Sequence, residues 1–507
     1  MSIVSFWFLV FICAGVILYY TLPKSWQWVG LLVMSILFYF MAAVPYTIVY
    51  VLVSVFVAYL ATNFAFFARF QSGRGKKIVC ILGILAIVVN TGLWFVLKGA
   101  DIWGKLVPGF NNAPVLPVAA LGMGYYTLQI IGYILDCFMG NALPQKNPLK
   151  LFLFVCFFPQ LITGPISRYG QLQGLYEGHE LSYKNIAFGA QRILWGFFKK
   201  LVLAERVGIA VNAVWDIQGQ DAVCLWFAFL LYPIQMYADF SGCMDIAIGT
   251  AECFGIKLPE NFNNPFFSRT IQEFWQRWHI TLGTWAKDYV LYPLLKTEGM
   301  LRFSKAAKKR FGKRYGKFIT SAVGMLVLWL VMGIWHGGMK YIVGVSMWYW
   351  FLLMLGELCS PGLKRLNKIL KINEECFSWH LFQSIRTYMI YAVGAVFFRA
   401  VNINEAILFL RNTIGAFFKG KWNFDIIFEL ETIMGLSGRD WIIVLLSIVM
   451  LVLVGLLRQN ADYARCWVEK QILPFRWGIW LGLFLFVVIY GKYGAEYNAV
   501  NFIYQAF

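Results

Sequence analysis

About ten stretches of this chain are apolar and long enough to cross a membrane as helices. A spanning helix needs roughly 17–25 such residues, and it satisfies its backbone hydrogen bonds internally. Only 14% of the residues are charged, which is too few to cover the core of a soluble protein of this length. We therefore predict an all-α polytopic membrane protein with roughly 10–12 transmembrane or re-entrant helices. The stretches run over 3–20, 27–43, 47–68, 78–98, 115–138, 318–335, 340–358, 385–398, 441–457 and 474–491.

The segment 151–290 differs from these stretches because proline, glycine and polar residues interrupt it throughout. Irregular backbone at membrane depth is tolerated only where protein buries it or where it lines a cavity. We expect broken or re-entrant helices here rather than clean spans. No linker divides the chain, so we expect one integral membrane domain over 1–507. Its parts would be N-terminal helices over 1–114, a core with the catalytic motifs over 115–400 and C-terminal helices over 401–507.

The charges are biased, with 44 Lys and Arg against 25 Asp and Glu, and basic residues gather in three loops. Residues 296–317 hold nine bases and one acid, and 69–77 and 364–371 add four bases each. Cytoplasmic loops carry such an excess, so we expect all three loops inside and the N-terminus outside the cell. The net charge of +19 is thus read as an orientation signal, and no nucleic-acid partner is expected.

Two of the four histidines stand out as candidates for chemistry. His336 follows an apolar run and precedes Gly337, and its ordinary pKa suits proton transfer near neutrality. The alternative is a helix-end histidine hydrogen-bonded at the membrane interface. His279 ends an aromatic stretch in which Glu273 and Arg277 are four residues apart and can pair. Its alternative setting is an interfacial amphipathic helix.

Other sources of chemistry are missing from the sequence. The ten cysteines are scattered, most of them in apolar runs, and no carboxylate pair has metal-ligand spacing with a histidine, so we expect no metal site. We find no nucleophilic-serine motif and no phosphate-binding loop. The chemistry that fits a histidine alone is direct transfer, in which it deprotonates a hydroxyl that attacks an acyl group. Polar residues are dense around the histidines, namely Asp239, Ser241, Asp245, Glu252, Glu260, Asn261, Asn263, Asn264, Arg269 and Asp288.

Several motifs in order resemble the membrane-bound O-acyltransferase superfamily, and most closely its branch of bacterial alginate and exopolysaccharide O-acetylases. The resemblance extends from about residue 115 to the end of the chain. The motifs are Phe157–Ile166, Tyr237–Gly242, Lys257–Pro265, Glu273–His279, Asp288–Tyr289, Trp335–Gly337, Val396–Ala400 and Phe502–Tyr504.

The resemblance implies a ring of helices around a buried tunnel, with His336 as the catalytic histidine and His279 as a second catalytic or orienting residue. The donor would be acetyl-CoA or another cytosolic acyl thioester, with no bound cofactor. The acceptor would be an extracytoplasmic polysaccharide or a partner acetyltransferase subunit. The location would be the bacterial inner membrane. Residues expected to bind substrate or to support the motifs are Asp239, Asn261, Asn264, Arg277, Trp278, Asp288, Trp335 and Gly337.

Three alternatives stay open. The related branch that D-alanylates teichoic acid shares the second histidine. A transporter of an acyl donor or lipid-linked sugar would share the broken helices, although no inverted repeat is visible. A membrane anchor that only docks an acetylase would not need a histidine beside glycines.

Overall fold

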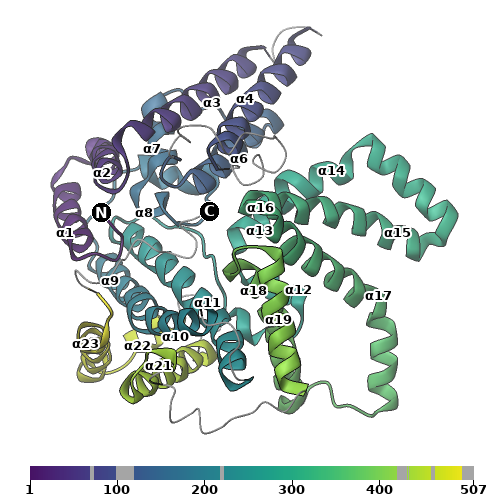
Figure 1. Cartoon of the computed structure of the whole chain (residues 1–507). Helices are drawn as coiled ribbons and strands as arrows, with labels where there is room; N and C mark the ends of the chain where they lie inside the picture. Colours follow the sequence, from purple (N-terminus) through teal and green to yellow (C-terminus); the bar gives the residue numbers. More distant parts are fainter. Residues whose placement is uncertain are drawn as a thin grey trace. The chain divides into compact units, whose positions relative to one another are not determined.

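The described part of the chain, in a computed structural model, is built from helices (Figure 1). Within the described ranges, the one β-type pairing is an isolated antiparallel bridge between Phe262 and Trp278. Most of the basic loop over 69–77, the start of the predicted span over 115–138 and the motif Phe502–Tyr504 lie outside the described residues. Those residues are 1–68, 74–98, 119–216, 222–418, 431, 433–457 and 463–493.

Within these described residues, nine helices are long and apolar enough to cross a membrane. They confirm the prediction of an all-α, multi-pass membrane protein. The helix α1 (Phe6–Thr21) is apolar but shorter, and α6 (Met123–Met139) covers most of the predicted span over 115–138. The nine candidates are Lys24–Ala42, Pro45–Phe66, Lys77–Leu97, Ala222–Cys253, Glu298–His336, Gly338–Ile369, Phe377–Arg399, Gly438–Leu457 and Leu473–Tyr490.

The expectation that 151–290 holds no clean span is wrong for one element. The helix α11 (Ala222–Cys253) continues for 32 residues through Pro233. Proline is tolerated in such a helix because neighbouring groups satisfy the backbone carbonyl that it frees. The other helices of the segment vary in length: α12 (Ile271–Arg277) and α13 (Ile280–Ala286) have seven residues each, whereas α9 (Tyr183–Phe197) has 15 and α10 (Glu205–Asp216) has 12.

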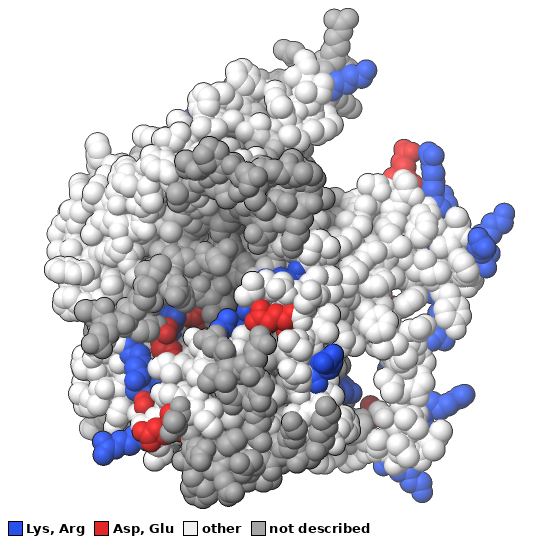
Figure 2. All heavy atoms as spheres, viewed as in Figure 1, with Lys and Arg blue, Asp and Glu red and all other residues white. Residues whose placement is uncertain are grey.

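The long helix α15 (Glu298–His336) is bent at Gly312, whose φ of 78° is left-handed. Lys296 ends the preceding helix α14 (Tyr292–Lys296), and the other basic residues of 296–317 lie on the first arm of α15 and the start of its second arm, where their side chains are exposed. Lys and Arg gather at this outer end of α15 in Figure 2. The second arm contains the predicted span over 318–335 and ends at His336. The bend at Gly312 therefore lies within the charged part of the helix, and the apolar part follows later in the second arm.

The chain forms two compact units. Unit 1 comprises Met1–Val202, Ala238–Glu260 and Asp462–Phe507, and unit 2 comprises Leu203–Tyr237 and Asn261–Ala461. Both candidate histidines lie in unit 2, whereas Asp239 lies in unit 1. The expected single domain, with its core over 115–400, stays a prediction.

Candidate active site

His336 is the last residue of α15 and is buried. Gly337 follows with φ 84° and ψ 151°, and Gly338 with φ 66° starts α16 (Gly338–Tyr341). The first of these conformations is almost exclusive to glycine, and the second strongly favours it. The glycines therefore let the chain turn away directly after the histidine. Among the described residues, no heavy atom lies within 4 Å of the position that a Cβ at Gly337 would take.

Aromatic rings pack against the His336 ring. The centroid distances are 4.7 Å to Trp335, 5.3 Å to Phe398 and 5.7 Å to Tyr341. Phe398 belongs to one of the sequence motifs, but Tyr341 was not among the predicted site residues. Its proximity follows from the turn at the glycines, which sequence spacing does not reveal.

Lys340 was also missed by sequence reasoning. Its ammonium group lies 4.8 Å from the centre of the Tyr341 ring. It donates a hydrogen bond of 2.6 Å to the carbonyl oxygen of Ala400 and one of 3.4 Å to that of Phe398. These carbonyls lie at the end of α18 (Phe377–Arg399), where a cation compensates unpaired acceptors. Lys340 thereby connects the turn after His336 to the helix that carries Phe398.

His279 is also buried, and it has the left-handed backbone conformation φ 46°, ψ 52°. Such a conformation costs a non-glycine residue roughly 1–2 kcal/mol, so the surroundings must enforce it. Asn261 does so from two sides. Its backbone carbonyl accepts from the amide of Ile280 at 3.0 Å, and its side-chain Oδ1 lies 3.1 Å from Nδ1 of His279. The same Oδ1 accepts from the backbone amide and hydroxyl of Thr281 at 3.1 and 2.8 Å.

The neighbouring predicted residues hold this arrangement in place. The amide of Asn263 donates to the carbonyl of Arg277 at 2.9 Å, beside the bridge between Phe262 and Trp278. The Trp278 ring stacks on Phe274 at 5.6 Å and is buried. Trp278 therefore acts as packing for the site.

The predicted pair between Arg277 and Glu273 is confirmed, with a distance of 2.6 Å from Nη2 to Oε1. It joins the two ends of the short helix α12, one turn apart. Asn264 donates from Nδ2 to the carbonyl of Gly455 in α21 (Gly438–Leu457) at 3.0 Å. Arg277 and Asn264 therefore both support the backbone that carries His279.

The structure brings the two predicted histidines together. The Trp335 ring lies 6.2 Å from the ring of His279 and 4.7 Å from that of His336. His279 lies outside the candidate spans. Burial and, to a lesser extent, the nearby His336 lower the pKa of His279 well below its usual value. His279 is therefore neutral near pH 7, and a neutral imidazole can accept a proton.

The last two predicted residues, Asp288 and Asp239, have different surroundings. Asp288 is exposed on the π-helical turn η7 (Lys287–Leu291) in unit 2. Asp239 is buried in unit 1, where it forms an ion pair with Lys200 at 2.5 Å. Within the described part of the chain, no group of three or more His, Cys, Asp or Glu side chains could hold a metal ion.

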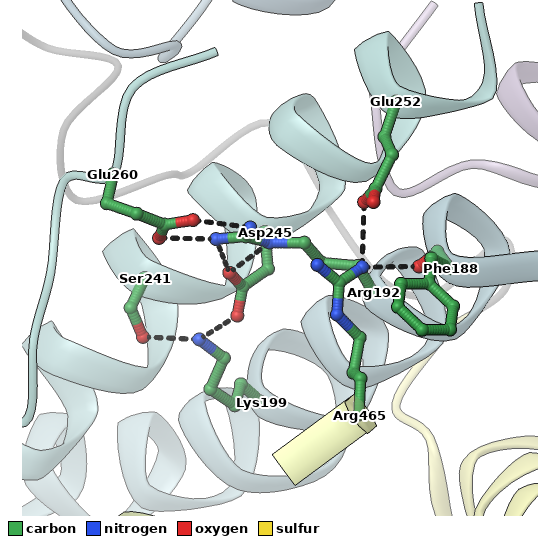
Figure 3. Close-up of polar contacts among 8 residues, drawn as sticks. All are labelled: Phe188, Arg192, Lys199, Ser241, Asp245, Glu252, Glu260 and Arg465. Atoms are coloured by element: carbon green, nitrogen blue, oxygen red, sulfur yellow. Dashed lines mark hydrogen bonds and ion pairs between the residues drawn. The ribbon is translucent and has the colours of Figure 1, made fainter. Parts of the chain in front are cut away.

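The acidic residues of α11 in unit 1 have basic partners that sequence reasoning did not identify (Figure 3). Arg192 on α9 (Tyr183–Phe197) binds Glu260 through two hydrogen bonds of 2.6 Å and Asp245 at 3.0 Å. Lys199 binds Asp245 at 2.6 Å and the Ser241 hydroxyl at 2.8 Å. The clue in the sequence was the presence of basic residues at 192 and 199–200 in an otherwise apolar stretch.

Close backbone contact between α9 and α11 accompanies these ion pairs. A Cβ at Gly196 would lie 2.6 Å from the carbonyl oxygen of Gly242, and one at Gly189 would lie 2.6 Å from that of Gly249. Glycines two helical turns apart on each helix thus bring the two backbones together. At the C-terminal end of α11, close to Gly249, Arg465 of α22 (Tyr463–Glu469) binds Glu252 and the carbonyl of Phe188, each at 2.7 Å.

A profile of the membrane-bound O-acyltransferase family matches residues 144–392, a range that contains both histidines. A teichoic acid D-alanyltransferase of Bacillus subtilis is 31% identical over 293 residues, which are 53% of this chain and 69% of that protein. This chain belongs to the membrane-bound O-acyltransferase family.

Two further relatives have names that refer to O-acetylation. A "probable alginate O-acetylase AlgI" of Pseudomonas syringae is 30% identical over 328 residues, which are 65% of this chain and 57% of the relative. The match thus spans less than two thirds of that relative. A peptidoglycan O-acetyltransferase of Helicobacter pylori is 29% identical over 427 residues, or 78% of this chain and 74% of the relative. The family resemblance suggested by the motifs is therefore confirmed.

Proposed function

We propose that this membrane-bound O-acyltransferase family member transfers an acyl group, which we take to be acetyl, to a hydroxyl of an extracytoplasmic polysaccharide. The observation that carries the proposal is the pair of buried histidines whose rings both lie near the ring of Trp335. A site of this kind can move a proton in a setting that excludes water. The names of the alginate and peptidoglycan relatives favour acetyl and a sugar polymer.

In the proposed reaction, His336 takes the proton of the acceptor hydroxyl as the hydroxyl oxygen attacks the acyl carbon of a thioester. The carbon–sulfur bond breaks when the resulting tetrahedral intermediate collapses, and the thiolate leaves with the bonding electron pair and is then protonated. His279 orients the acceptor or shares its proton. Trp335, Tyr341 and Phe398 limit the access of water to this proton transfer. Asn261, Asn264, Arg277 and Trp278 hold the backbone around His279.

The donor would arrive from the cytosol as acetyl-CoA or another anionic acyl thioester. This part of the proposal depends on charge, because the cluster over 296–317 is a cytoplasmic signal and would also attract an anion. The protein would lie in the bacterial inner membrane with its N-terminus outside. The acetyl group would pass along a tunnel ringed by the helices to the polymer, or to a partner subunit that delivers it.

The test compares a variant of His336 with a control variant of another histidine, His380. His336→Ala should abolish acetylation of the native exopolysaccharide, measured by mass spectrometry at equal protein level in the membrane. His380→Ala, on the partly exposed first turn of α18, should leave acetylation unchanged. Acetylation at the wild-type level in His336→Ala would overturn the proposal.

Two further measurements separate the alternatives. Purified protein should release acetyl from a labelled thioester in the presence of a polymer acceptor, whereas a transporter or an anchor would not. D-alanyl transfer to teichoic acid has specific support from the Bacillus subtilis relative. Ester-linked D-alanine on the cell wall that disappears in His336→Ala would select this second function.

A further inference from the structure

We infer that Asn261 is a positioning residue that fixes His279 as the Nδ1–H tautomer and leaves Nε2 as the nitrogen with the lone pair. The inference deepens the proposed function, because it assigns which atom of His279 can accept a proton from the reacting hydroxyl. It rests on the hydrogen bonds around a single oxygen atom in unit 2.

The orientation of the Asn261 amide follows from its partner. A backbone N–H can only donate, and the backbone amide of Thr281 lies 3.1 Å from one terminal atom of the Asn261 side chain. That atom must therefore be the oxygen Oδ1, because the NH2 group cannot accept a hydrogen bond. The Thr281 hydroxyl at 2.8 Å fits the same oxygen as a second donor.

The tautomer of His279 follows from the amide. Nδ1 of His279 lies 3.1 Å from Oδ1 of Asn261. An unprotonated Nδ1 would place its lone pair against the lone pairs of that oxygen, so Nδ1 must carry the hydrogen. In a neutral imidazole only one ring nitrogen is protonated, and the partner of one nitrogen decides the state of the other. Nε2 is then the acceptor.

Backbone hydrogen bonds also hold His279 beside Asn261. His279 is held in the left-handed region, and the amide of the next residue, Ile280, donates to the Asn261 carbonyl at 3.0 Å. Two consecutive amides, those of Ile280 and Thr281, are therefore tied to one asparagine through its main chain and its side chain. Asparagine suits this position because it has a side-chain acceptor without a charge. Aspartate would also accept these bonds but would place a negative charge beside the ring.

The experiment reads the tautomer directly. The full-length protein, with histidine rings labelled by 15N, is reconstituted in lipid vesicles and studied by solid-state NMR near pH 7. A protonated and an unprotonated ring nitrogen resonate far apart, and with four histidines in the chain, His279→Gln assigns the signal of interest. We expect a protonated Nδ1 and an unprotonated Nε2 in the wild-type protein. A protonated Nε2 with an unprotonated Nδ1 would overturn the inference without any variant.

Variants then test whether Asn261 is the cause. Asn261→Ala should lose the preference for Nδ1–H and reduce the rate of acyl transfer at least tenfold, whereas Asn261→Asp should keep Nδ1 protonated. Thr284→Val is the matched control, because this hydroxyl bonds only to backbone carbonyls of the same short helix among the described residues. It should leave both tautomer and rate unchanged. An unaltered Nδ1–H signal in a folded Asn261→Ala protein would overturn the assignment.

The tautomer measurement does not depend on turnover. If His336→Ala retained full acetylation, the proposed function would fail while the NMR assignment stood. If wild-type His279 carried its hydrogen on Nε2, this inference would fail while the acyltransfer proposal stood.

Discussion

Replacing Arg192 with methionine tests how far the buried ion network in unit 1 stabilises the protein. Arg192 supplies three hydrogen bonds, two to Glu260 and one to Asp245. Lys199 also pairs with Asp245, so that two positive and two negative side chains balance. Methionine fills a similar volume but leaves this group with one uncompensated negative charge.

The expected cost follows from burial. The side chains of Arg192 and Asp245 are only 7% and 8% exposed, so water cannot replace the lost partner of Asp245. The Glu260 side chain is 32% exposed and can be partly hydrated. Breaking a buried ion pair costs about 3–5 kcal/mol, and the access of water to Glu260 places this case near 3 kcal/mol. A change of about 1.4 kcal/mol in an activation free energy changes a rate tenfold, so Arg192→Met raises the unfolding rate by up to about 100-fold.

The assay compares rates of irreversible thermal unfolding in lipid nanodiscs, since large membrane proteins seldom refold. The double variant Arg192→Met/Glu260→Gln restores neutrality and should recover part of the loss, with a coupling of about 1–3 kcal/mol. Lys184→Ala is the control, because its pair with Glu469 is largely exposed and worth less than about 1 kcal/mol. An unfolding rate at the wild-type level in Arg192→Met, or no recovery in the double variant, would refute the charge argument.

Three further predictions concern other parts of the chain. Gly337→Ala should lower the free energy of unfolding by about 1–3 kcal/mol and reduce acyl transfer, because φ 84° with ψ 151° strains any side chain. The control is Gly356→Ala inside α17 (Trp348–Ile369), where a Cβ meets no neighbour among the described residues; it should be neutral or stabilising. An equal loss of unfolding free energy in both variants would contradict this reasoning. Lys340→Met should destabilise the end of α18 and slow acyl transfer at constant protein level, and a rate at the wild-type level would exclude a role at the site. Burial lowers the pKa of His179, so the unfolded chain binds this proton more readily than the folded protein, and stability is lost as the pH falls below about 6.5. Plots of stability against pH that stay parallel for wild type and His179→Gln between pH 7 and 5 would contradict this.

Much of the helical framework could be predicted because its signals are local. An apolar run of sufficient length predicts a spanning helix whatever its neighbours are, and the runs over 318–335 and 441–457 lie inside observed helices. The pair between Glu273 and Arg277 was also predictable, since four residues make one helical turn. The prediction was wrong for α11, because whether Pro233 and buried acids break a helix depends on partners far away in the sequence.

The candidate site was predictable only in part. The motifs identified His279 and His336, but nothing in their spacing placed both rings beside Trp335. Lys340 and Tyr341 reach the site through the turn at the glycines, and short-range sequence patterns do not encode where such a turn directs the chain.

The sequence by itself determined that this chain is a helical membrane protein and which histidines to consider, because hydropathy and motif order need no partner. Only the tertiary structure decided which groups meet. Asn261 reaches His279 through a short antiparallel pairing, and Arg192 reaches Asp245 and Glu260 because glycines let α9 approach α11. Hydrogen bonds and ion pairs act over a few ångströms, so their energies depend on packing between segments that are distant along the chain.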